Sequence, residues 1–232
     1  MYTVVTTCND KQWAEYGKRM VDSFYKYWPT GVNIKIYADY DYQSGFHWGR
    51  LPEWHTAFKQ RYADHADANG MASGVYNYRR DCVRFSHKVA AITDAARTIG
   101  DGVLIWIDAD TFTDKPVPID ALHRWLPEDC AISWLDRGRV YPECGFMMFR
   151  NAWAWLPKLT DLYESDKVFG YSETHDSYVI QQFVKRLGLR VHNLSGPAST
   201  RSHPWVGSEL GQYMDHLKGA RKALGKSGER NV

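Results

Sequence analysis

Five large apolar residues, Val103–Ile107, are followed at once by two aspartates, Asp108 and Asp110, with a single alanine between them. An unbroken apolar run of this length predicts a strand buried on both faces, as in a parallel sheet covered by helices. No other feature restricts the fold as strongly, because such a strand needs helices packed on both sides of its sheet.

The two aspartates are spaced to act on one point. Carboxylates at positions i and i+2 leave a strand end on the same side, and their negative charge costs free energy there unless a cation or hydrogen bonds compensate. Mg²⁺ and Mn²⁺ prefer oxygen ligands and bind through one or two carboxylates, with substrate phosphates completing the shell. We therefore predict a Mn²⁺ or Mg²⁺ site at Asp108 and Asp110. A solvated turn is the alternative interpretation.

The rest of the chain alternates strands and helices. The sequence predicts strands over 2–8, 32–37, 131–135, 145–149 and 190–192, and helices over 11–27 (with Asp10 as N-cap), 81–98, 152–165 and 175–187. No linker interrupts the 232 residues. We therefore expect a single-domain α/β sandwich with a mostly parallel, mixed central sheet flanked by helices.

Residues 39–80 differ from this pattern. The stretch is rich in Trp, Tyr and Phe among Gly, Asp and His, and we expect an irregular insertion with one helix over 53–66. Aromatic residues reach 15% of the chain, which suits a well-filled core or a surface that stacks on sugar rings or bases.

The C-terminal segment carries most of the positive charge. From residue 216 to the end there are five Lys or Arg against one Glu, a local net of 5 − 1 = +4, whereas the whole chain carries only +2. His216 could bind a metal as a neutral imidazole. Gly219 would let backbone N–H groups approach a phosphate, and Lys218 and Lys222 would neutralise it. We expect residues 203–232 to close over such a ligand, although a solvated tail with a surface histidine is the simpler alternative.

Cysteine usage and hydropathy indicate the compartment. The four cysteines show no C-x-x-C pair and no framework spacing, which favours buried thiols in a reducing environment. The N-terminus lacks the pattern of a signal peptide, and no window approaches 18 uninterrupted apolar residues. The expectation is a cytoplasmic protein without a membrane span.

Taken in chain order, these features resemble the GT-A fold (Rossmann-like) glycosyltransferases, in particular the family 8 group of glycogenin and bacterial galactosyl- or glucosyltransferases. The resemblance rests on the N-terminal strand ending in Thr-Thr, on IWIDAD in mid-chain, and on a late H-x-x-G-x-x-K at His216, Gly219 and Lys222. The Pro-Trp that usually follows is Ala223-Leu224 here.

Three further segments are similar to parts of the same group. ECGFMMF resembles its Asn-x-Gly strand, with Glu143 in place of the Asn, and ETHDSYVI resembles its Asp-Gln helix start, with Asp176 aligned and Ser177 in place of the Gln. RFSHK resembles the basic helix that approaches the nucleotide sugar. The likeness covers most of the chain apart from 39–80.

The resemblance implies a role for each matching residue. Thr6, Thr7 and, more weakly, Asp10 would lie at the nucleoside. Asp108 would reach ribose and metal, with Asp110 and His216 as the other metal ligands. Lys218, Gly219 and Lys222 would contact the diphosphate, and Arg84 and Lys88 the donor phosphate or sugar. Glu143 and Asp176 would be catalytic, facing the transferred sugar and the acceptor.

The function this implies is metal-dependent transfer of a hexose or pentose from a nucleoside-diphosphate sugar, with UDP expected, to a hydroxyl acceptor. A glycan is the first expectation for the acceptor and a hydroxymethylated base in DNA the second. An inverting enzyme would use Glu143 or Asp176 as a base for the acceptor hydroxyl, whereas the resemblance implies retention. The oligomeric state stays open.

Other classes compete with this interpretation. A haloacid-dehalogenase-like, Mg²⁺-dependent phosphatase or phosphotransferase also carries a strand-end D-x-D, but Gly-Thr is expected where Thr111-Phe112 stands. A nucleotidyltransferase uses similar carboxylates. A non-catalytic nucleotide-sugar-binding module would keep its activity when Asp110 is replaced by Asn, whereas a transferase would lose turnover.

Overall fold

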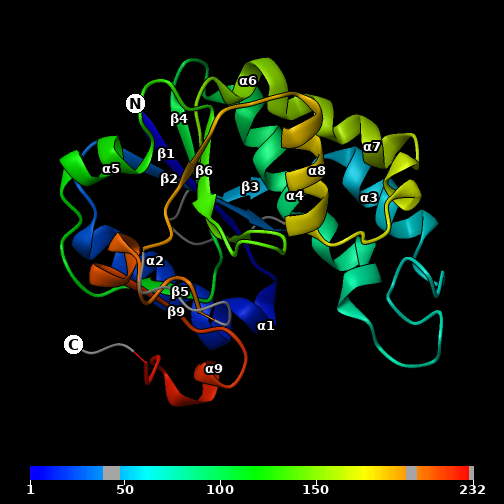
Figure 1. Cartoon of the computed structure of the whole chain (residues 1–232). Helices are drawn as coiled ribbons and strands as arrows, with labels where there is room; N and C mark the ends of the chain where they lie inside the picture. The colour runs from blue at the N-terminus through cyan, green and yellow to red at the C-terminus, as the bar shows by residue number, and fades with distance from the viewer. Residues whose placement is uncertain (39–47, 197–202, 230–232) are drawn as a thin grey trace.

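A computed structural model describes residues 1–38, 48–196 and 203–229 and shows a central sheet between two layers of helices (Figure 1). The sheet has seven strands in the order β3-β2-β1-β4-β7-β6-β8. Their bounds are β1 (Tyr2–Thr7), β2 (Val32–Ala38), β3 (Trp48–Arg50), β4 (Val103–Ile107), β6 (Ile132–Leu135), β7 (Glu143–Phe149) and β8 (Val191–Asn193). The predicted α/β sandwich is confirmed.

Strand direction fixes which residues meet at one edge of this sheet. β1, β2, β3 and β4 are parallel, and β7 is antiparallel to both of its neighbours, β4 and β6. β6 and β8 are again parallel. The prediction of a mostly parallel mixed sheet is therefore confirmed. The start of β7 consequently lies beside the carboxyl ends of β1 and β4, which is the edge where ligands bind in open α/β sheets.

The longest helix is α4, with 17 residues, and the others are shorter. The helices are α1 (Asp10–Gln12), α2 (Lys18–Tyr27), α3 (Glu53–Arg61), α4 (Cys82–Thr98), α5 (Ile119–Trp125), α6 (Ala152–Trp155), α7 (Thr160–Glu164), α8 (Asp176–Arg186) and α9 (Arg221–Leu224). A π-helical stretch over Trp13–Gly17 joins α1 to α2, and a 3₁₀ turn over Leu156–Leu159, which contains a proline, joins α6 to α7.

Alternating strand residues supply two cores. Leu104 and Trp106 of β4 face α4 and its neighbours, whereas Val103, Ile105 and Ile107 face α2 and α5. Figure 1 shows α4, α6, α7 and α8 on one side of the sheet and α2 and α5 on the other. All five residues are buried, so the strand is apolar on both faces, as the sequence predicted.

A second, two-stranded sheet lies below the main one. β5 (Thr111–Thr113) and β9 (Met214–His216) pair antiparallel, and β5 packs against α2. Both are only three residues long, and neither was predicted from the sequence. Because β5 follows shortly after β4, its pairing with β9 places the C-terminal segment near the end of β4.

Three sequence predictions are changed by the structure. Asn9, and not Asp10, is the N-cap of α1: its side chain accepts a hydrogen bond from the Gln12 N–H, and the Gln12 side chain accepts one from the Asn9 N–H. Trp48–Arg50 within the expected irregular insertion is a strand of the main sheet. The helix expected over 53–66 ends at Arg61. Residues 39–47 of that insertion lie outside the described residues.

The remaining element predictions agree with the structure to within a few residues. The four cysteines are buried and unpaired, as expected. Across the described ranges, none of the helices combines the length and the hydropathy needed to cross a membrane. The single-domain assignment and the closing role of residues 203–232 remain predictions, and 197–202 and 230–232 are outside the described residues.

Candidate functional site

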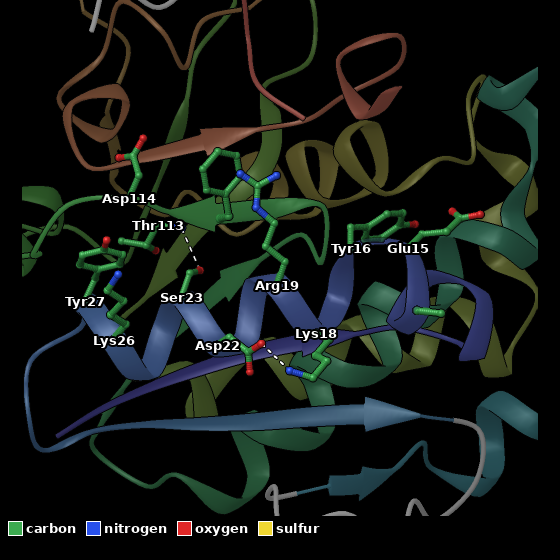
Figure 2. Close-up of a pocket in the computed structure, with 12 residues that line it drawn as sticks. Glu15, Tyr16, Lys18, Arg19, Asp22, Ser23, Lys26, Tyr27, Thr113 and Asp114 are labelled. Carbon is green, nitrogen blue, oxygen red and sulfur yellow. Dashed lines mark hydrogen bonds and ion pairs between the residues drawn. The ribbon is translucent and has the colours of Figure 1, made fainter. Parts of the chain in front are cut away.

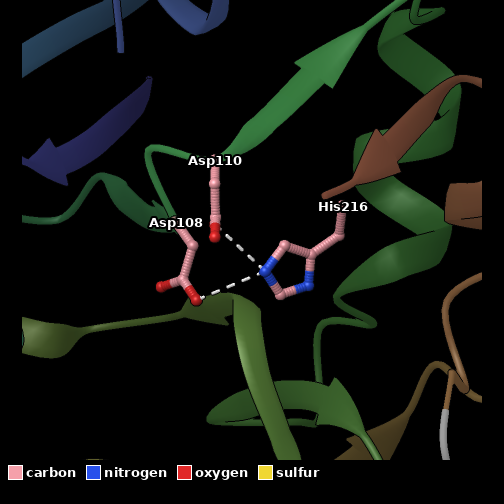
Figure 3. A group of neighbouring side chains, drawn as sticks. All are labelled: Asp108, Asp110 and His216. Carbon is pink, nitrogen blue, oxygen red and sulfur yellow. Dashed lines mark hydrogen bonds and ion pairs between the residues drawn. The ribbon is translucent and has the colours of Figure 1, made fainter. Parts of the chain in front are cut away.

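Asp108, Asp110 and His216 converge just beyond the carboxyl end of β4 (Figure 3). The Nε2 atom of His216 lies 3.1 Å from Oδ1 of Asp110 and 3.6 Å from Oδ2 of Asp108. One ligand atom from each residue lies within 4.8 Å of the others. Two carboxylates and an imidazole are a donor set that Mn²⁺ or Mg²⁺ accepts, so these residues fit the predicted metal.

Two local features hold His216 against the aspartates. His216 pairs with Thr111 across the β5–β9 sheet, and the following residue, Leu217, donates its N–H to the Asp110 carbonyl at 2.9 Å. Gly145 of β7 leaves room for the imidazole, because a Cβ there would lie only 2.7 Å from the His216 Cε1. A larger residue at position 145 would therefore displace the ring.

The carboxylate of Asp110 lies between the His216 imidazole and the Lys222 ammonium. The Lys222 ammonium lies 2.9 Å from its Oδ2 and 4.4 Å from the centre of the Tyr16 ring. Burial alone would raise the pKa of Asp110, but His216 and Lys222 outweigh it and hold this pKa well below its usual range. Asp110 is therefore ionised at neutral pH and available to a cation.

Asp108 is fixed from the opposite side. Its Oδ1 accepts a hydrogen bond from the Trp106 indole at 2.7 Å and lies 2.9 Å from the Lys88 ammonium. Lys88 also lies 2.5 Å from Asp176 and donates to the Cys144 carbonyl. Burial would lower the pKa of Lys88, yet Asp108 and Asp176 together raise it above its ordinary value. A buried ammonium is thus shared between two carboxylates.

Asp176 and Glu143, the predicted catalytic pair, both form ion pairs with basic side chains. The pKa of Asp176 is kept low because Lys88 and His175 outweigh the effect of burial. Glu143 is paired with Arg137 and lies 3.0 Å from the Lys218 ammonium. Both carboxylates are buried, so they are held in one position by these partners.

A cavity of about 1000 Å³ opens at this edge of the sheet and brings most predicted residues together. Of the residues predicted from the sequence, those that line it are Thr7, Arg84, Lys88, Asp108, Asp110, Glu143, Asp176, His216, Lys218, Gly219 and Lys222. Thr6 and Asp10 do not line it. Thr6 is buried at the back of β1, and Asp10 is exposed on α1.

Several lining residues were not predicted. Asn9, Gln12 and Tyr16 come from the first helical turns, and Arg137 and Tyr141 come from the loop before β7. Asn9 and Gln12 carry a capping-box pattern, which predicts a helix start but says nothing of a cavity. No sequence signal marked Arg137 or Tyr141, because their role depends on where the loop lies.

Comparison with known proteins gives remote structural likeness only. No protein-family model matches the sequence, and no curated protein matches it. Similar solved structures include mouse xyloside xylosyltransferase 1 (10% identity, 84% of this chain and 85% of that chain, TM-score 0.49). They also include a glycosyltransferase involved in the glycosylation of the major capsid of PBCV-1 (11%, 96% of each chain, 0.49).

A third similar structure is the glycosyltransferase GlyE of Streptococcus pneumoniae TIGR4, with 11% identity and a TM-score of 0.49. The match covers 84% of this chain and 46% of GlyE. At this level of similarity, function has to be argued from the site.

Proposed function

We propose that this protein is a metal-dependent glycosyltransferase that moves a sugar from a nucleoside-diphosphate sugar to a hydroxyl acceptor. The observation that carries the proposal is the Asp108–Asp110–His216 group at the wall of a large cavity, with Lys218 and Lys222 beside it. A cation-binding group next to two ammonium groups suits a diphosphate, which carries several negative charges.

The residues on the C-terminal side would hold the diphosphate. Asp108, Asp110 and His216 would bind a Mn²⁺ or Mg²⁺ ion, which would neutralise charge that develops on the leaving diphosphate. Lys222 would exchange its contact with Asp110 for one with a phosphate, and the loop at Gly219 would present backbone N–H groups. These interactions strengthen as the sugar–phosphate bond breaks, so they stabilise the transition state more than the bound donor.

The nucleoside would lie next to the diphosphate, on the wall formed by the end of β1 and the first helical turns. Thr7, Asn9, Gln12 and Tyr16 line the cavity there and offer hydroxyl and amide groups next to an aromatic ring. Polar groups of this kind, set around a ring face, suit a base and a ribose. We expect the nucleotide to be UDP.

The sugar would lie near Lys88, Glu143 and Asp176, where no carboxylate is suited to remove a proton. The four carboxylates that line the described part of the cavity all have cationic partners. A carboxylate with a depressed pKa, such as Asp176, is a weak base. We infer that Asp176 holds Lys88 in place and that transfer proceeds with retention of configuration.

The acceptor would enter past a ring of aromatic side chains. Tyr76, Tyr78 and Tyr141 line the cavity, and Tyr76 and Tyr78 are 48% and 42% exposed. Exposed tyrosines stack on sugar rings, which favours a glycan or another hydroxyl acceptor. Arg79 and Arg84 beside them keep a hydroxymethylated DNA base as the second candidate, and activity that falls steeply with added salt would favour it.

Release of nucleoside diphosphate from a panel of nucleotide sugars tests the proposal. The assay compares Mn²⁺ with EDTA and the native protein with Asp110→Asn, and uses Asp64→Asn, an exposed position away from the cavity, as the matched control. We expect release from one donor, lost with EDTA and with Asp110→Asn but kept with Asp64→Asn.

Other outcomes point to the competing classes. Donor binding without turnover in the presence of any acceptor would indicate a binding module. Release of inorganic phosphate from phosphate esters would indicate a phosphatase. If neither Mn²⁺ nor any nucleoside diphosphate bound, the glycosyltransferase proposal would be abandoned.

A further inference from the structure

We propose that Asp215, Ser227 and His203 form a buried polar latch that positions the C-terminal loop over the donor site. The loop is residues 217–226, and it carries Lys218 and Lys222. This inference rests on the proposed function for its chemical meaning, but the latch itself is defined by contacts that need no ligand.

The latch joins two points of the chain that are twelve residues apart. Ser227 donates from its backbone N–H to Oδ2 of Asp215 at 2.7 Å and from its hydroxyl to Oδ1 at 2.6 Å. The Nε2 atom of His203 lies 2.9 Å from the same hydroxyl oxygen. Asp215, His203 and Ser227 are 0%, 4% and 3% exposed.

Proton positions follow from these contacts. A serine hydroxyl has one proton, and here it points to the carboxylate, so the oxygen accepts from the Nε2–H of a neutral His203. Both carboxylate oxygens of Asp215 are therefore used by Ser227. Buried polar groups that satisfy one another in this way are costly to separate, since each partner would otherwise be left unpaired.

Apart from Leu217 and the ion pairs of Lys218 and Lys222 at the cavity, the loop buries little of its own surface. Helix α9 within it buries no residue, and Leu224 is 70% exposed. Gly219 and Gly225 turn the chain with positive φ angles of 64° and 68°, a conformation that glycine adopts without strain. The two ends of the loop are thus joined by the hydrogen bonds of the latch, and its apolar packing is weak.

One outer contact assists the latch. Arg19 rises from α2 toward β5, beside an open groove of about 570 Å³ (Figure 2). Its guanidinium lies 3.5 Å from the centre of the Phe112 ring and donates to the Gly225 carbonyl at 3.0 Å. This contact is more exposed than the latch, so we assign it the smaller share of the holding energy.

Strand β9 links the latch to the metal ligands. Asp215 and His216 are successive residues of β9, so their side chains leave the strand on opposite faces. His216 faces the aspartates, and Asp215 faces the returning chain. A loop closed at Asp215 holds Lys218 and Lys222 next to the site before the donor arrives, which reduces the ordering cost of binding.

Amide hydrogen exchange over 217–226 tests the latch directly. The variants are Ser227→Ala, Asp215→Asn and the double variant. Ser165→Ala is the control, since Ser165 is exposed and its hydroxyl also donates a hydrogen bond, there to the Asp161 backbone carbonyl. We expect Ser227→Ala and Asp215→Asn to speed exchange of 217–226 without changing exchange in β4. The effects in the double variant should be less than additive, because both changes affect the hydrogen bond between the Ser227 hydroxyl and Asp215.

The second measurement uses UDP and Mn²⁺ as probes. Ser227→Ala removes the buried hydroxyl and its contacts with Asp215 and His203, and should weaken UDP binding roughly five- to tenfold, while Mn²⁺ affinity measured without nucleotide stays unchanged. In turnover, KM for the donor should rise with kcat nearly constant. A purely structural role would lower Mn²⁺ affinity, UDP affinity and thermal stability together.

The two proposals fail separately. If the native protein binds no nucleoside diphosphate, the proposed function fails, and the exchange data still decide on the latch. If the native protein binds UDP with Mn²⁺ and Ser227→Ala changes neither exchange over 217–226 nor UDP affinity, the latch is overturned. Additive effects in the double variant would also overturn it.

Discussion

The four carboxylates of the cavity fall into two pairs that the protein treats differently. Asp108 and Asp110, at the end of β4, have 27% and 15% of their side chains exposed and lie within reach of His216. Asp176 and Glu143, deeper in the cavity, each have 6% exposed and are fully paired with Lys88, Lys218 and Arg137. All four carboxylates have cationic partners, but the first pair is more exposed and lies beside His216, whereas the second is almost fully buried.

This contrast separates carboxylates that could bind a metal ion from carboxylates that hold other side chains in place. A carboxylate that is ionised, partly exposed and close to another ligand can receive a metal ion. Asp176 and Glu143 are almost fully buried among their cationic partners, so they are less accessible to a metal ion than the first pair. Replacing one member of each pair should therefore give different kinds of defect, and the first two predictions test this.

The largest effect is expected from Asp110→Asn. The amide keeps the shape of the side chain but removes the charge, so turnover should fall by roughly 10³-fold and Mn²⁺ binding should be lost, with little change in thermal stability. Steady-state kinetics and Mn²⁺ titration measure this. Loss of stability without loss of Mn²⁺ affinity would show that Asp110 holds other side chains in place, as Asp176 and Glu143 do, and does not bind the metal.

Asp176→Ala should show the opposite pattern. Removing the carboxylate leaves the buried Lys88 ammonium with fewer partners, and breaking a buried ion pair costs about 3 kcal/mol in unfolding free energy. Denaturant unfolding measures this cost. Mn²⁺ affinity should stay close to the native value, because the ion-pair partners of Asp176 are Lys88 and His175 and not the proposed metal-binding residues. A stable variant that loses only turnover would restore Asp176 as a catalytic residue.

Gly145→Ala tests whether His216 binds the metal together with Asp108 and Asp110. The new Cβ would lie 2.7 Å from the His216 Cε1, so the imidazole must move, and we expect a roughly tenfold weaker Mn²⁺ affinity with about 1–2 kcal/mol lost in stability. Gly170→Ala is the matched control, since nothing lies within 4 Å of its Cβ position and its φ is not positive. Equal effects of the two changes would argue against His216 as a ligand.

The smallest expected effect is on pH dependence. Burial holds the pKa of His203 at about 4, below 6.5 for a free imidazole. As pH falls below 6.5, the unfolded chain therefore binds a proton at His203 before the folded protein does. The free energy of unfolding is unaffected by this group above pH 6.5 and decreases between 6.5 and 4, by at most about 2 kcal/mol at pH 5. Unfolding curves of native protein and His203→Asn measure this. Parallel pH profiles would contradict the assignment.

The sequence predicted the main sheet well because its strands have a strong local pattern. Val103–Ile107 is apolar throughout, and the two aspartates follow it directly, so the fold class and two of the three members of the metal group were accessible. His216 was placed through the H-x-x-G-x-x-K pattern. β5 and β9 were not predicted, because three residues carry no periodicity and their pairing joins positions about 100 residues apart.

The supporting contacts were beyond sequence reasoning for a different reason. Glu143 and Asp176 were predicted as catalytic from the resemblance, and only the structure shows that Lys88, Lys218 and Arg137 occupy them. Nothing in the sequence pairs Lys88 with Asp176, since they lie on separate helices. The latch residue Ser227 likewise lies in a short polar stretch without a pattern.

The order of synthesis gives the β5–β9 pairing a further consequence. All seven strands of the main sheet are encoded by residue 193, whereas the imidazole that completes the cation-binding group comes at residue 216. Domains tend to fold from the N-terminus as the chain emerges from the ribosome. The scaffold can thus form around two aspartates alone, and the third ligand arrives only when translation is nearly finished. A chain cut short before β9 would keep its architecture and lack the means to hold the ion.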